Sequence, residues 1–274
     1  MSDPVATLPS VRIARFGGDS AALAAWTGAP GDPPDSDDLV AWDGPEVVGV
    51  LHPWRSPDGR LHVYFDRTRP EAFQPLAEAV DGACYAMVDD PAGVDALTRA
   101  GFRVSRRESL YEIPVAPIDA SVPAGLRIVP AGQVEMEPLA RLDADLRADV
   151  PGTGDWQVDL DFFRAQTYDS PYYDPSTYRV ALNADDPVGL ARVWNGPPPE
   201  PRLGLIAVLP AYRRRGLARA LLAAAFGPLV ERGERAVTAE VDTTNIASNA
   251  LLTSLGGRVT GESVELFRAA AGSG

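Results

Sequence analysis

The chain has 274 residues, of which 45% are hydrophobic and 23% charged, and its formal net charge is −13. Composition and length are those of a globular protein with two domains or one large one. The acidic balance disfavours a nucleic-acid or anionic-membrane surface, and the chain has no apolar run of about 18 residues that could span a membrane.

Several kinds of chemistry are excluded by missing residues. All 25 basic residues are arginines, which rules out a P-loop lysine and a Schiff-base lysine. With two histidines, His52 and His62, and a single cysteine, Cys84, we expect no metal site and no disulfide framework. The first ten residues lack the features of a secretory signal, which predicts a cytoplasmic protein.

Three short stretches occur twice in the chain and in the same order. The pairs are Val11–Gly17 with Leu126–Gly132, Val48–Trp54 with Val188–Trp194, and Leu97–Val104 with Leu252–Val259. We therefore predict two copies of one α/β unit, at 1–115 and 126–274, with a Pro/Ala-rich linker at 116–125. Chance similarity of strand–turn patterns is the alternative.

Hydrophobic periodicity gives the expected elements of the second copy in chain order. They are a strand at 126–129, a helix at 138–147, an irregular or helical segment at 149–175, strands at 178–182, 188–194 and 203–208, a helix at 217–230, a strand at 236–241, a helix capped by Thr244 or Asn245 and ended by Gly256, and two last strands in "GRVTG" and "VELFR". Gly227-Pro228 should kink the helix at 217–230 or end it early. This order predicts a mixed sheet with helices on both faces.

The stretch "VLPAYRRRGLARALL", 208–222, joins a predicted strand to a predicted helix. The first turn of a helix has backbone N–H groups without intrahelical partners, and the helix dipole adds positive potential there. Gly216 lets the backbone approach a ligand closely, and Ala218 keeps the first turn uncrowded. We predict a pyrophosphate site at this turn; a solvated basic helix start and a nucleic-acid patch are the alternatives.

The same residues resemble a known family. V-x-P-x-x-R-x-x-G-x-A at 208–218 resembles the acyl-CoA-binding signature of the GNAT superfamily of N-acetyltransferases, and "EVDTTNIASNALLTSLGG" at 240–257 resembles a second stretch of that family. The resemblance covers about residues 126–268. A fainter version covers 11–115, where "YFDRTRPEAFQPL" has no glycine at the corresponding turn, so we expect this copy to have lost its CoA site.

The tandem layout with one degenerate copy is similar to that of mycothiol synthases. The resemblance implies an α/β fold of two GNAT-like units, each a mixed, mostly antiparallel then parallel sheet with helices on both faces. It also implies acetyl-CoA as co-substrate without a metal. The implied CoA-binding residues are Ala207, Val208, Arg213, Arg214, Arg215, Gly216, Leu217, Ala218, Arg219, Asn245 and Asn249.

The family's reaction is direct attack of an amine on the thioester in a ternary complex. The resemblance implies that the Val208 N–H polarises the carbonyl and that Glu240 is the general base, with a pKa that desolvation raises. Asp242 is a second candidate, and a solvent-facing or salt-bridged strand-end carboxylate is the alternative for Glu240. Leu252 stands where the family has a proton-donating tyrosine, and Gly257 where it has phenylalanine.

Three other residues, Ser248, Thr253 and Tyr212, are possible substitutes for the missing tyrosine. The segment 143–174 has eight aspartates against two arginines, with six aromatic residues interleaved. Carboxylates beside aromatic faces suit a cationic amine, and we expect Asp149, Asp155 and Trp156 to contact it. Helix caps, a solvated helix face and core aromatics are the alternative.

The leading hypothesis is therefore a bacterial N-acetyltransferase that moves acetyl from acetyl-CoA to a cationic amine, small molecule or peptide, with no nucleic-acid or membrane partner. A non-catalytic acyl-CoA-binding regulatory protein is the second hypothesis, favoured by Leu252. An O-acyl or longer-acyl transferase is the third.

Overall fold

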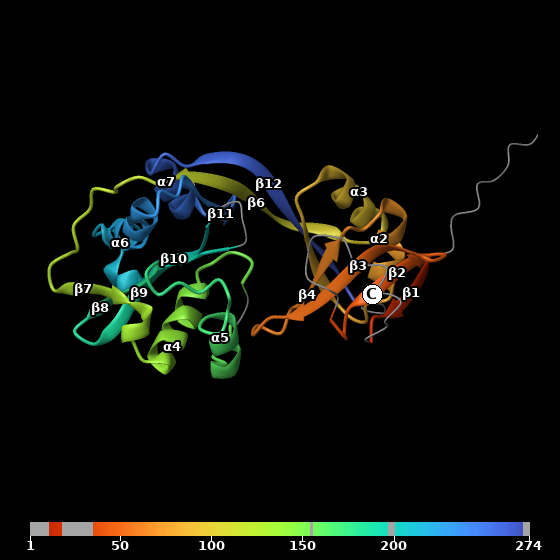
Figure 1. Cartoon of the computed structure of the whole chain (residues 1–274), viewed down its shortest axis with the longest axis horizontal. Coiled ribbons are helices and arrows are strands. Elements are labelled where there is room, and N and C mark those ends of the chain that lie inside the picture. Colours follow the sequence, from red (N-terminus) through yellow and green to blue (C-terminus); the bar gives the residue numbers. More distant parts are fainter. Residues whose placement is uncertain (1–10, 18–34, 154–155, 197–200, 271–274) are drawn as a thin grey trace, which may run out of the picture. The chain divides into compact units, whose positions relative to one another are not determined.

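The structure, a computed structural model, describes residues 11–17, 35–153, 156–196 and 201–270 (Figure 1). Contacts divide the chain into two units, 1–107 with 263–274 and 108–262. None of the helices in the described ranges has the length and apolar character needed to cross a membrane.

The first unit is built on a mixed sheet. Its elements are β1 (Arg12–Arg15), β2 (Leu39–Asp43), β3 (Glu46–Arg55), β4 (Leu61–Asp66), α2 (Pro70–Glu78), β5 (Cys84–Val88) and α3 (Pro91–Arg99). Strands β1 to β4 pair antiparallel in chain order, and β4 pairs parallel with β5. Helices α2 and α3 pack into one shared core against the sheet.

The second unit repeats this topology. Its elements are β7 (Leu126–Pro130), α4 (Met136–Arg147), α5 (Leu160–Gln166), β8 (Tyr178–Asn183), β9 (Asp186–Trp194), β10 (Arg202–Val208), α6 (Leu217–Glu231), β11 (Ala236–Asp242) and α7 (Ile246–Ser254). Strands β7 to β10 are antiparallel, and β10 pairs parallel with β11. The predicted mixed sheet, antiparallel first and then parallel, is confirmed in both units.

Two long strands, β6 (Arg103–Pro114) and β12 (Arg258–Arg268), contribute to both units. β6 follows α3 of the first copy, but residues 108–114 of β6 pair with β11 of the second unit. β12 follows α7 of the second copy, but residues 264–268 of β12 pair with β5 of the first unit. Each sheet thus receives the last strand of the other copy. The expected domains 1–115 and 126–274 followed chain order, whereas the contacts group residues 108–115 with the second unit and 263–274 with the first; the expected bounds stay a prediction.

One local prediction is wrong. The two final strands are one strand of 11 residues, β12. Thr260 bonds to the Leu110 carbonyl at 3.2 Å, and Val264 and Leu266 are buried against β5, so the backbone stays extended through Gly261. Of the two effects expected of Gly227-Pro228, a kink or an early end, the early end does not occur: the helix predicted at 217–230 continues to Glu231 as α6, because the buried side chains on either side of the proline hold the last turn in the core.

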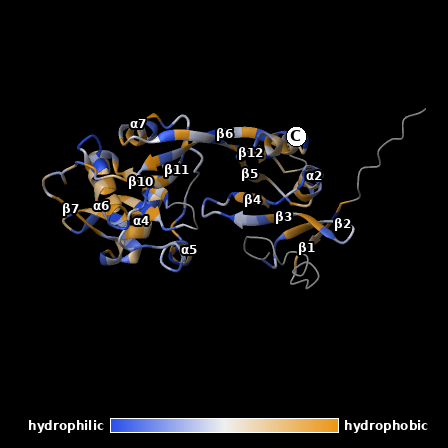
Figure 2. Cartoon of the chain, turned by 45° about the horizontal axis from the view of Figure 1, so that its top comes forward, coloured by the Kyte–Doolittle hydropathy of each residue, from blue (hydrophilic) through white to orange (hydrophobic). Residues whose placement is uncertain are grey.

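The sheet of the second unit is covered on both faces, as predicted. Helices α6 and α7 pack on one face, where Leu217, Leu221 and Phe226 are at most 1% exposed. Helix α4 packs on the other face, over Tyr178 and Leu190. Figure 2 shows the hydrophobic residues concentrated along β10, β11 and α6. Burial of this apolar area is the main force that fixes β10 and the start of α6 in place.

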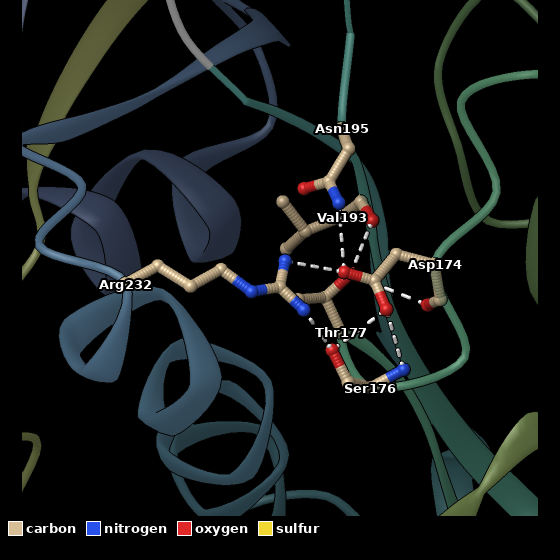
Figure 3. Close-up of polar contacts among 6 residues, drawn as sticks. All are labelled: Asp174, Ser176, Thr177, Val193, Asn195 and Arg232. Atoms are coloured by element: carbon tan, nitrogen blue, oxygen red, sulfur yellow. Dashed lines mark hydrogen bonds and ion pairs between the residues drawn. The ribbon is translucent and has the colours of Figure 1, made fainter.

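A polar cluster fastens the end of α6 to the segment before β8 (Figure 3). Asp174 accepts hydrogen bonds from the Ser176 N–H at 2.7 Å, from Asn195 at 2.7 Å and from Arg232 at 2.5 Å. Burial alone would raise the pKa of Asp174, but the bonds from Arg232 and Ser176 outweigh it and lower this pKa from 3.8 to about 2. The Asp174 carboxylate therefore has a structural role, because its oxygens already accept hydrogen bonds within the protein.

We expect Asp174→Asn to lower the free energy of unfolding by about 1–3 kcal/mol at pH 7, because the amide replaces an ionised acceptor and leaves Arg232 without its partner. The pKa of Asp174 is lower in the folded state than in the unfolded chain. Its contribution is therefore complete above pH 4 and is lost as the pH falls toward 2. Urea unfolding at pH 7 and pH 3 measures both effects. Equal loss of stability in Asp161→Asn, an exposed carboxylate, would contradict the assignment.

Candidate functional site

Strands β10 and β11 separate soon after they begin. Arg202 opposite Thr238 is their one register pair among the described residues, although β10 continues to Val208. Leu209 donates its N–H to the Val188 carbonyl of β9 at 2.9 Å. Successive residues of a strand point their N–H groups to opposite sides, so the Val208 N–H points away from β9 and toward the separating β11. A hydrogen-bond donor to a ligand bound between β10 and β11 would need to point in this direction.

The turn between β10 and α6 has the backbone of an anion site. A short 3₁₀ turn at Pro210–Tyr212 is followed by Arg214 with φ +58° and Gly216 with φ +82°. Helix α6 begins at Leu217 without a side-chain cap on its first N–H groups. A Cβ on Gly216 would meet nothing within 4 Å, so the left-handed backbone, rather than crowding, is the reason for glycine here.

The three consecutive arginines have different surroundings. Arg213 donates its Nε to the Val208 carbonyl at 2.8 Å and pairs with Asp149 through Nη2. Arg215 lies 5.8 Å from the ring centre of Tyr212. Arg214 is exposed. Arg213 therefore supports the shape of the turn, whereas Arg214 and Arg215 lie at the surface beside the uncapped N–H groups.

Arg219 and Ala218, both expected at the CoA site, lie in the first turn of α6. Arg219 donates to the Asp119 carbonyl at 3.2 Å and to Ser254 Oγ at 3.5 Å, which ties this turn to the end of α7. Leu217 is 1% exposed and faces the core. The side chain of Leu217 therefore supports the turn, and only its backbone is available to a ligand.

Glu240 lies on β11 in a pair with Arg202. Arg202 Nε is 2.8 Å from Oε2 and 3.1 Å from Oε1 of Glu240, and the side chains are 49% and 28% exposed respectively. The structure thus has the alternative arrangement, a salt-bridged strand-end carboxylate. A general-base role for Glu240 stays a prediction, and it requires that Arg202 release one carboxylate oxygen.

Asn245 and Asn249 both bond within the protein. Asn245 caps α7 by accepting from the Ser248 N–H at 3.1 Å, as the sequence predicted. Asn249 donates to the carbonyls of Asp242 and Asn245 and accepts from the Tyr111 hydroxyl at 2.9 Å. Asp242 accepts from the N–H and hydroxyl of Thr244. These side chains shape the start of α7, and their contact with CoA remains a prediction.

The two departures from the family pattern have a shared structural explanation. Leu252 is 1% exposed within the core of α6 and α7. A Cβ on Gly257 would lie 2.7 Å from the Leu252 carbonyl oxygen, too close for any side chain. The end of α7 is therefore packed for leucine and glycine, and Leu252 offers no proton to a leaving thiolate.

Half of the aspartates in 143–174 are used inside the protein. Asp143, Asp149 and Asp174 are paired with arginines, and Asp159 caps α5 by accepting from the Phe162 N–H at 2.9 Å. The ring of Trp156 already contacts a cation, because the guanidinium carbon of Arg147 lies 4.2 Å from the ring centre. Asp155 lies outside the described residues. The alternative of caps and internal pairs thus accounts for four of the eight, which weakens the argument for a cationic acceptor.

Sequence reasoning missed the partners Arg202, Tyr111 and Arg192. Arg202 contacts Glu240, Tyr111 contacts Asn249 and Arg192 contacts Asp143, because strand register and helix packing bring together positions far apart in the chain. Isolated arginines and a tyrosine on predicted strands give no separate signal. In the described part of the chain, no group of three His, Cys, Asp or Glu side chains is arranged to hold a metal.

Comparison with known proteins agrees with this geometry. The family described as "Acetyltransferase (GNAT) family" matches residues 146–256. A protein named mycothiol acetyltransferase from Thermobispora bispora is 31% identical over 246 residues, covering 82% of this chain and 81% of that protein. Another of the same name, from Kocuria rhizophila, is 28% identical and covers 83% and 88%.

Solved structures share the whole two-unit fold. A GCN5-related N-acetyltransferase from Sphaerobacter thermophilus superposes with a TM-score of 0.66 at 17% identity, covering 90% of this chain and 84% of that one. A tandem GNAT protein of the clavulanic acid biosynthesis pathway has a TM-score of 0.65 at 16% identity and covers 96% and 100%. The expected fold class, two GNAT-like units, is thereby confirmed.

Proposed function

Because the chain belongs to the GNAT family of acetyltransferases, and is by that membership an N-acetyltransferase, we propose that it transfers the acetyl group of acetyl-CoA to an amine. The main support is the turn at Gly216, where uncapped N–H groups of α6 lie beside the end of β10. Such a turn binds phosphate oxygens through backbone N–H groups and the helix dipole. Arg214 and Arg215 supply the positive charge for the remaining phosphates.

In the proposed reaction, the amine nitrogen attacks the thioester carbonyl carbon. The carbonyl oxygen gains negative charge, which the Val208 N–H stabilises. Glu240 takes the proton of the attacking nitrogen, and the C–S bond then breaks. The CoA sulfur leaves as thiolate; because a thiol pKa is about 8.5, departure without a proton donor costs little near neutral pH. This chemistry is compatible with Leu252 in place of the tyrosine.

The acceptor is proposed at the level of class. Both curated relatives are named mycothiol acetyltransferase. We therefore propose an acceptor amine like the one those enzymes acetylate, and not a nucleic-acid or membrane component. The exposed Asp145 and Asp161 remain as candidates for steering a positive amine toward the segment 143–174.

A panel of amines, with the acceptor of the two named relatives as its first member, tests the proposal. We expect CoA-thiol release from acetyl-CoA that depends on one of these amines, and stabilisation of the protein by CoA of about 2.7 kcal/mol at a hundred times its Kd. CoA binding without turnover of any amine would favour the non-catalytic acyl-CoA-binding protein. Absence of CoA binding would contradict both.

A further inference from the structure

A buried carboxylate on α4 has no place in the reaction described above. Asp143 is 2% exposed. One of its oxygens accepts from Arg147 Nε at 2.6 Å and the other from Arg192 Nη1 at 3.0 Å. Burial alone would raise the pKa of Asp143, but Arg192 and Arg147 outweigh it and hold this pKa below its ordinary value. The group is therefore a permanent negative charge between two guanidinium groups.

On one side this charge fixes the segment where we expect the acceptor. Arg147 is the last residue of α4, and its guanidinium lies 4.2 Å from the ring centre of Trp156. The carboxylate of Asp143 holds that guanidinium through Nε, which keeps the cation over the indole ring. Trp156 in turn lies edge to face with Phe162 of α5 at 6.2 Å.

On the other side the same charge fixes a tryptophan that covers β10. Arg192 of β9 has a side chain only 7% exposed, 4.9 Å from the ring centre of Trp194. A Cβ on Gly204 would lie 2.4 Å from Trp194 Nε1, so the indole rests directly on the backbone of β10. Gly204 lies where the β9–β10 register shifts, between Leu203 and Leu205. This irregularity lies just after Arg202, within the stretch where β10 separates from β11.

We infer that Asp143 is a positioning residue that sets two walls of the site at once: Trp156 on the acceptor side through Arg147, and Trp194 on the shifted part of β10 through Arg192. The inference rests on the proposed function in placing the acceptor beside Trp156. It assigns Asp143 no contact with substrate. It explains why this aspartate of the acidic segment is buried instead of facing the amine.

The structure offers a matched control on the same helix. Glu137 and Arg141 form a second acid–arginine pair four residues apart on α4, with side chains 57% and 66% exposed. It has the spacing and charges of Asp143 and Arg147, but among the described residues it contacts no aromatic ring and no buried partner. Exposed pairs of this kind contribute about 0.3–0.5 kcal/mol, so their loss leaves the fold intact.

The test uses the full chain labelled with 5-fluorotryptophan, in which each of the five tryptophans gives one ¹⁹F NMR resonance. Trp156→Phe and Trp194→Phe assign the two resonances of interest. We expect Arg147→Gln to shift the Trp156 resonance alone and Asp143→Asn to shift both. Arg141→Gln should shift neither. This readout does not require turnover, so it remains valid if the proposed reaction is wrong.

Kinetics give the second readout. Small misplacements of positioning groups cost up to about 10²-fold in rate, so we expect Asp143→Asn to lower kcat/KM for the acceptor by about 10- to 100-fold. Arg147→Gln should raise the acceptor KM and leave the acetyl-CoA KM unchanged. If Asp143→Asn does not fold, Asp143→Glu, which keeps the charge at a longer reach, should still shift both resonances. A shift of only one resonance, or full acceptor kcat/KM in the folded variant, would overturn the inference.

Discussion

Glu240→Gln is expected to lower kcat by about 10²- to 10⁴-fold, the range found when a general base is removed. The amide cannot take the proton of the attacking amine, although it has the same shape as the carboxylate. The KM for acetyl-CoA should change little, because Glu240 is not part of the turn around Gly216. Steady-state thiol release at saturating acetyl-CoA measures the effect. The fold should persist, since the partly exposed pair with Arg202 contributes no more than about 1 kcal/mol.

Two further variants separate a base from a structural pair. Arg202→Gln breaks the same pair but leaves the carboxylate of Glu240 in place, so we expect it to keep most of kcat. Glu231→Gln, at the far end of α6, should behave as wild type. If Arg202→Gln lost as much kcat as Glu240→Gln, the pair would matter through structure and the general base would have to be another group.

Gly216→Asp is expected to weaken CoA binding by at least about tenfold relative to Gly216→Asn, a difference of about 1.4 kcal/mol. Aspartate and asparagine have the same size and both tolerate the left-handed backbone with φ +82° that the structure has at this position. They differ by one negative charge, which at the start of α6 repels the pyrophosphate. Thermal-shift titration with CoA measures both variants in parallel.

The salt dependence of this comparison provides its control. Screening at high ionic strength weakens repulsion between exposed charges, so the difference between aspartate and asparagine should shrink as salt is raised from about 0.1 M to 1 M. Neither variant should clash, because a Cβ at Gly216 meets no atom within 4 Å, and without ligand the aspartate should be the more stable by about 0.3–1 kcal/mol, since its charge is favourable at the start of α6. Equal CoA affinity of the two variants at low salt would place the phosphates elsewhere.

Local signals in the sequence gave the elements of the site. Signals within a few residues predict three elements of the site. Hydrophobic period predicts the strand ending at Val208, the glycine before Leu217 predicts the helix starting there, and capping preference predicts the cap at Asn245. These determinants are short-range, so they can be recognised from a single amino-acid sequence. The same holds for Gly256, whose φ of +83° ends α7.

The long-range contacts that decide which charged side chains are available to a ligand could not be predicted from such local signals. Whether Glu240 is free or paired depends on Arg202, and whether Asp143 faces solvent or the core depends on Arg192, 49 residues away in the chain. Such pairs are set by strand register and by which helix face packs inward. The composition of 143–174 suggested aspartates available to a cationic amine, whereas half of these aspartates pair with arginines or cap a helix within the protein.

The exchange of β6 and β12 has a consequence for how the chain is made. Residues 264–268, which pair with β5, are synthesised after all the elements from β6 to α7. Until then the first unit has an unpaired edge at β5, a surface prone to wrong pairing with other strands. The first half of the chain therefore cannot complete its sheet before the second copy has been synthesised. Both halves reach their final form together, only after the end of β12 has been synthesised.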